Sequence, residues 1–155
     1  SGGHVWVAEA GQSDFTADWL KVVRERLPSM DTVKRVHVVQ HSDWNESSTS
    51  PESLAYVKQH ADYRKIPDGN EADNGTPGLR AESDEYWQIA LGSTQNGETW
   101  NLARELAMKY NGQDGRYNNT AVEMGGMDFS DVSETCWIFG FGDLRDVEAF
   151  FAEFQ

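Results

Sequence analysis

The sequence predicts an α/β fold: a three-layer sandwich with a mostly parallel sheet and a helix-rich C-terminal part. Two observations lead to this prediction. In the first half of the chain, short β-rich runs alternate with helical patterns, which is typical of parallel strands joined by helical crossovers. In the second half, most apolar residues recur at the three- and four-residue spacing of helices. The 155 residues suit one domain, residues 1–155, around a single core.

The first predicted unit is a strand, a loop and a helix. His4 to Ala8 is a short apolar run with β-branched residues, which is typical of a buried strand, and a polar turn with a glycine follows it. From Phe15 onward, apolar residues recur at helical spacing. Ser13 or Asp14 is placed to cap this helix, and Pro28 is placed to end it.

A second unit of the same kind follows. Residues 36–40 form another β-rich run, residues 41–48 a polar loop, and residues 51–60 a helix with proline at its first position. Further along, the pattern predicts a weaker strand, a long irregular loop and three helices, at residues 63–66, 67–80, 84–91, 99–110 and 143–154. Long loops inside compact domains are usually functional.

The charge of the chain excludes two classes of partner. It has 13 Lys and Arg against 26 Asp and Glu, a formal net charge of −13, and no basic cluster. Nucleic acids and anionic membrane surfaces need a positive protein surface, so we expect neither as a partner. The longest uncharged apolar stretch, around residues 136–142, is far shorter than the ~20 residues of a membrane span.

The cysteine content and the first residues bear on disulfide bonds, processing and cellular location. Cys136 is the one cysteine, which excludes an internal disulfide and a cysteine-rich zinc site, and its apolar neighbours indicate a structural thiol. The start at Ser1 suggests an interior cut or a processed end, so we expect a single domain that is either complete or a lobe of a longer protein. Localisation stays open, with a periplasmic or secreted location slightly favoured over a cytoplasmic one.

The carboxyl ends of the predicted strands carry the main functional signal. Ligands of open parallel sheets bind outside these ends. Asp14, Asp43 and Asp68 each follow a strand, and carboxylates gathered there bind a hard cation, hold sugar hydroxyls or act as acid and base. Asp14 and Asp43 are equally good turn and helix-capping residues, so both interpretations stay open.

Two further residues at this edge invite a functional interpretation. His41 follows the second strand and is the one histidine that we would test as a general acid, whereas His37 alternates with valines like a packed strand residue. The histidines lack the spacing of a zinc motif. Trp44, beside Asp43, is a candidate stacking platform for a sugar or a base, while the other tryptophans lie where burial is the default.

The order of these pieces resembles the inosine/uridine-type nucleoside hydrolases, which are calcium-dependent N-glycosidases with an α/β fold. The resemblance covers the second half of such an enzyme, and the N-terminal aspartate cluster of the family has no counterpart here. Four segments carry it: the turn Gly11 to Thr16, the strand and loop Val36 to Asp43, the loop Asn74 to Pro77, and the late aspartate Asp128.

The resemblance implies a hydrolase that acts on N-ribosides or related glycosides, with this chain as its C-terminal lobe and the catalytic base in a missing N-terminal lobe. It implies calcium as the cofactor, with Asp128 as a ligand. The residues expected to contact the sugar or nucleoside are Asp14, Asp43, Trp44, Asn74 and Glu82. The alternative is a non-catalytic carbohydrate-binding or subunit-assembly domain, whose C-terminal apolar elements pack on a missing lobe or on a second copy in a homo-oligomer.

Overall fold

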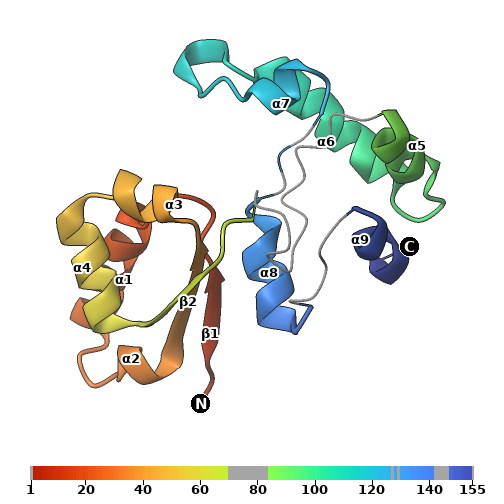
Figure 1. The fold of residues 1–155 in the computed structure, drawn as a ribbon. Coiled ribbons are helices and arrows are strands. Elements are labelled where there is room, and N and C mark those ends of the chain that lie inside the picture. Colours follow the sequence, from red (N-terminus) through yellow and green to blue (C-terminus); the bar gives the residue numbers. More distant parts are fainter. Residues whose placement is uncertain (1, 70–83, 127, 129, 142–146, 155) are drawn as a thin grey trace.

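The structure, a computed structural model, describes residues 2–69, 84–126, 128, 130–141 and 147–154 (Figure 1). Three strands, β1 (Val5–Ala8), β2 (Val36–His41) and β3 (Asp62–Ile66), form a parallel sheet in the order β1-β2-β3. The predicted α/β fold with a mostly parallel sheet and a helix-rich C-terminal part is therefore confirmed.

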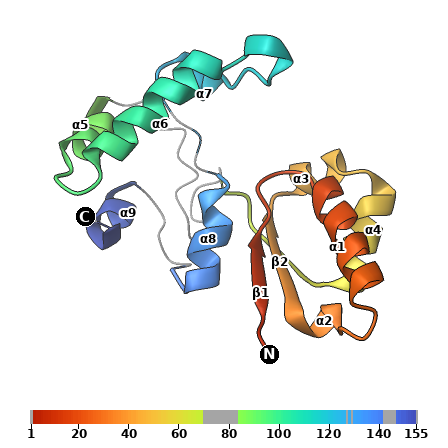
Figure 2. The same ribbon diagram turned by 180° about the vertical axis from the view of Figure 1, so that it is seen from behind.

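Helices cover both faces of this sheet. Helices α1 (Asp14–Arg26) and α4 (Pro51–His60) lie on one face, and helix α8 (Val132–Phe139) lies on the other, as Figures 1 and 2 both show. Because side chains alternate along a strand, Val36 and Val38 face α1 and α4, whereas His37 and His41 face the α8 side. The two faces therefore differ: one is apolar, and the other carries two histidines.

The apolar face holds the main core. Its buried residues come from both helices and from the central strand: Ala17, Leu20, Val36, Val38, Val57 and Ala61. Fully burying a leucine or valine stabilises the fold by roughly 1.5–3 kcal/mol relative to leaving it exposed. This core fixes the positions of the strand ends that form the pocket described below.

The rest of the described chain is helical. Helices α5 (Asp84–Gly92), α6 (Gly97–Tyr110) and α9 (Val147–Phe154) share a second apolar cluster with Trp87, Ala90 and Phe151 buried in it. This cluster lies beyond α8, on the side away from α1 and α4 (Figure 2). The smaller elements are α2 (Thr32–Arg35), α3 (Asp43–Ser48), the 3₁₀ turn η1 (Gln113–Gly115) and α7 (Thr120–Glu123).

Two local predictions were wrong. The predicted polar loop 41–48 contains helix α3, because the Ser42 hydroxyl accepts a hydrogen bond from the backbone N–H of Trp44 and caps this short helix. Strand β1 was expected to be buried, but it is an edge strand in which Val5 is 55 % and Trp6 43 % exposed. In the part of the chain that the structure describes, no helix has the length and apolarity needed to span a membrane.

Candidate functional site

A pocket of about 970 Å³ lies at the carboxyl end of the sheet. All three strands contribute to it through their last residues or the residues that follow them. Gly11 and Gln12 follow β1, His41 ends β2 and is followed by Ser42, Trp44 and Asn45, and Asp68 follows β3. The opposite wall comes from α6, α7 and the segment before α8, including Ala107, Tyr117, Asn119, Val122, Asp128, Ser130 and Asp131. The strand ends therefore meet at one concave surface, as the rule for parallel sheets predicts.

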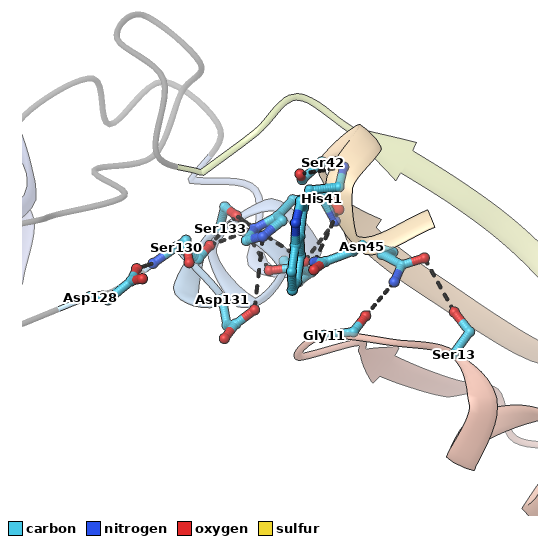
Figure 3. Close-up of polar contacts among 12 residues, drawn as sticks. Gly11, Ser13, His41, Ser42, Asn45, Asp128, Ser130, Asp131 and Ser133 are labelled. Carbon is cyan, nitrogen blue, oxygen red and sulfur yellow. Dashed lines mark hydrogen bonds and ion pairs between the residues drawn. The ribbon is translucent and has the colours of Figure 1, made fainter. Parts of the chain in front are cut away.

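The turn after β2 sets the shape of this surface. Ser42 has a backbone φ of 73°, a left-handed conformation that few residues other than glycine adopt. Its hydroxyl accepts from the N–H of Trp44 at 3.0 Å, and the Asn45 side chain donates to the His41 carbonyl at 3.3 Å (Figure 3). These bonds hold the chain in a sharp turn that presents both His41 and Trp44 to the pocket. Unusual backbone conformations of this kind concentrate at functional sites.

His41 is buried between β2 and the start of α8, and its contacts fix its tautomer. Nδ1 lies 2.8 Å from the carbonyl oxygen of Ser130 (Figure 3). A carbonyl can only accept a hydrogen bond, so Nδ1 carries a hydrogen and donates it. Nε2 is then the ring atom free to exchange a proton, and it lies 3.9 Å from Oδ1 of Asp131 at the pocket wall.

Glu134 lies beneath His41, and its side chain is fully buried. Oε1 accepts the backbone N–H of His41 at 2.7 Å, which ties α8 to the end of β2. Burial raises the pKa of this carboxyl to about 7, against the opposing effect of the charge on His41. A neutral Glu134 fits the local network, because the Ser133 hydroxyl donates to Ser130 at 2.5 Å and can accept from Oε2 at 3.3 Å.

Two aspartates complete the wall of the pocket. Partial burial raises the pKa of Asp131. The negative charge of Asp128 raises this pKa further, whereas the positive charge of His41 lowers it. Asp128 accepts the backbone N–H of Ser130 at 3.0 Å and the side-chain amide of Asn119 at 2.9 Å (Figure 3 shows the first). Asp128 is thus held in place, while Asp131, whose side chain is 52 % exposed, is open to a ligand.

Among the described residues, one group of three ionisable side chains has the spacing of a metal site. His41, Asp131 and Glu134 each offer a ligand atom within 4.8 Å of the others. An imidazole with two carboxylates suits metals such as Zn²⁺ or Mn²⁺, whereas calcium takes six to eight oxygen ligands. This donor set does not by itself indicate calcium, and Asp128, the calcium ligand that the resemblance implies, lies beside the group.

The residues expected from the sequence lie in different places. Trp44, 62 % exposed, and Asp128 both line the pocket. Asp43 forms an exposed ion pair with Lys65 and lines a smaller neighbouring pocket of about 460 Å³ together with Trp44. Asp14 is the first residue of α1 and accepts hydrogen bonds from the backbone N–H and the hydroxyl of Ser50, the residue before α4. It does not line the pocket, and no side-chain hydrogen bond within the described residues caps the start of α1, so neither predicted role of Asp14 is seen. Asn74 and Glu82 lie outside the described residues.

Asp131 and Glu134 were missed by the sequence analysis. The available signal was an Asp and a Glu three residues apart at the start of a helix, which ordinarily indicates capping. Their contacts with His41 join segments about ninety residues apart in the chain, so no local spacing could reveal them.

Comparisons of the chain with protein-family models, with curated proteins and with solved structures found no match. Function therefore has to be inferred from the chemistry of the pocket. That chemistry combines an oriented imidazole, several carboxylates and an exposed indole ring at the end of a parallel sheet.

Proposed function

We propose that this pocket binds the sugar of a nucleoside or a related glycoside and that the protein hydrolyses its glycosidic bond. The observation that carries the proposal is the orientation of His41. Its Nδ1 is occupied by the Ser130 carbonyl, so that Nε2 lies beside the Asp131 carboxylate at the wall of a polar pocket. A proton-transferring imidazole next to a carboxylate is a suitable pair for acid-catalysed bond cleavage.

The pocket walls suit a polyhydroxylated ligand. A volume of about 970 Å³ lies within the usual range of small-molecule sites. Asp68, Asp128 and Asp131 supply acceptors for sugar hydroxyls, and Gln12 and Asn119 supply amides. The exposed ring of Trp44 offers a flat apolar surface for a sugar face or a base.

The chemistry then divides between two side chains. With a proton on both ring nitrogens, His41 would donate the Nε2 proton to the leaving group while its Nδ1–H stays bonded to Ser130. The water that adds to the sugar carbon would then return a proton to Nε2. The carboxylate of Asp131 would stabilise the positive charge that develops on the sugar ring as the bond breaks. The resemblance to nucleoside hydrolases supports the same reaction class, and it implies a calcium ion that would position water and the sugar diol.

Hydrolysis of p-nitrophenyl β-D-ribofuranoside, inosine and uridine tests this proposal. We expect wild-type protein to release the leaving group, and His41→Gln to lower kcat by roughly 10²-fold or more. His60→Gln is the matched control, because His60 lies beside Arg24 at the end of α4 and should leave the rate unchanged. Each reaction is run with calcium, with manganese and with a chelator to identify the metal requirement.

Titration of the protein with the same ribosides, compared with the hydrolysis rates, separates hydrolysis from simple binding. If ribosides bind and Trp44→Ala weakens the binding, but no leaving group is released, the chain is a non-catalytic carbohydrate-binding domain. The exposed Trp44 beside a polar pocket is the observation that favours this second function. If the wild-type protein neither binds nor cleaves any riboside, the proposal is refuted.

A further inference from the structure

A row of side chains crosses all three strands at the other end of the α8 face. Trp6, His37 and Asp62 are register partners on β1, β2 and β3, so they lie next to one another. His4 comes two residues before Trp6, and the alternation of side chains places it on the same face. The row therefore brings two imidazoles and a carboxylate together at the amino end of the sheet.

The contacts in this row form a continuous chain. His37 Nδ1 lies 2.7 Å from Oδ2 of Asp62, and His37 Nε2 lies 2.8 Å from Nδ1 of His4. The two imidazole rings are inclined by 16°, with centroids 5.0 Å apart. The two nitrogens, 2.8 Å apart, are much closer than the two ring centroids, 5.0 Å apart. The edges of the two rings that carry these nitrogens therefore face each other.

The protons of this chain can be assigned from the same contacts. Oδ2 of Asp62 faces His37 Nδ1 and also accepts two hydrogen bonds from the Arg64 guanidinium, as a carboxylate anion does, so it accepts the Nδ1 hydrogen of His37. His37 Nε2 then presents a lone pair toward His4, and one hydrogen lies between the two rings. A carboxylate behind Nδ1 is the usual orienting partner of a metal-bound histidine.

We propose that a divalent transition-metal ion, of the class of Zn²⁺, Ni²⁺ or Cu²⁺, replaces this hydrogen and is bound by His37 Nε2 and His4 Nδ1. Imidazole ligands favour these metals, whereas calcium and magnesium prefer oxygen ligands. Water completes the coordination, because His4 is at the surface. Asp62 orients His37 from behind and stays outside the coordination sphere.

In this site His37 is held in place by its neighbours, whereas His4 is exposed and can adjust its position to a metal ion. The His37 side chain is 12 % exposed and lies under the Trp6 ring, with centroids 4.3 Å apart. Arg64 bonds the same oxygen of Asp62 and lies over the rings of Trp6 and Trp137, so its charge is balanced by the carboxylate. Exposed His4 can rotate to meet the ion without disturbing this packing.

This site is distinct from the pocket. His37 and His41 are four residues apart on β2, which places them about 13 Å apart along the strand. Metal binding here therefore does not depend on the proposed hydrolase function, and variants can separate the two.

Zinc titration of the 155-residue chain without an added tag, monitored by calorimetry, tests the proposal. We expect His4→Gln to lose one bound zinc that His41→Gln and the control His60→Gln retain. Asp62→Asn should weaken the same zinc by roughly 10–100-fold, because His37 loses its orienting partner. Since His4 is exposed, His4→Gln should keep the circular dichroism spectrum of the wild type.

Two outcomes would overturn the proposal. One is a wild-type protein that takes up no zinc, nickel or copper at millimolar metal. The other is a His4→Gln variant that binds zinc with the stoichiometry and affinity of the wild type. In either case the His4–His37 contact is a hydrogen bond without a metal-binding role.

Discussion

Replacement of Glu134 by alanine is expected to lower the free energy of unfolding by about 3 kcal/mol at mildly acidic pH. The fully buried carboxyl accepts the backbone N–H of His41, and alanine would leave both an unsatisfied donor and a cavity between α8 and the sheet. Urea unfolding followed by circular dichroism measures the change.

Glu134→Gln is the matched control for this variant. Glutamine keeps an acceptor for the His41 N–H and places an N–H where the neutral acid has its O–H, facing Ser133. We expect it to be close to the wild type in stability at about pH 5. If the alanine and glutamine variants lose the same stability, the hydrogen bond from His41 does not join α8 to β2 as described.

The second expected result is a fall in the stability of the wild type as pH rises from about 4.5 to about 7. Glu134 has the higher pKa in the folded state, so over this range the folded protein binds more protons than the unfolded chain. The free energy of unfolding therefore decreases with pH, by at most about 3 kcal/mol for a shift of this size. Outside this range, Glu134 does not make the free energy of unfolding depend on pH.

Comparison with Glu134→Gln isolates this effect from the other carboxyl groups. The variant lacks the titrating group but keeps every other one, including Asp131 and Glu9, whose pKa values burial also raises. We expect the stability of Glu134→Gln relative to the wild type to increase between about pH 4.5 and about pH 7. If the free energies of unfolding of the two proteins change in parallel with pH, burial does not raise the pKa of Glu134.

Much of the fold could be predicted because its signals are local. Helix α4 occupies the predicted residues 51–60, since Ser50 and Pro51 mark its start in the sequence. Strand β2 was recognisable from its valines, although alternation alone does not show that His37 pairs with Asp62 on the next strand. The exposure of β1 depends on its place at the sheet edge, which is a property of the tertiary structure.

The candidate site was only partly predictable for the same reason. The strand-end rule placed His41, Trp44 and Asp68 correctly at one edge, because it follows from the topology of a parallel sheet. Glu134 lies in the predicted helix-rich C-terminal part, and its packing against β2 is set by the three-dimensional arrangement. Asp14 illustrates the converse: a carboxylate near a strand end can bond to the residue before a helix that lies far along the chain, here Ser50 before α4.

Nitrogen-15 NMR of the imidazole side chains can decide whether His41 is the reacting group of the pocket. We expect His41 to be protonated at Nδ1, and its Nε2 resonance to move when a riboside is added, while the His60 resonances stay in place. Riboside binding that leaves His41 unchanged, or a free protein with the proton of neutral His41 on Nε2, would show that the pocket does not work through this side chain.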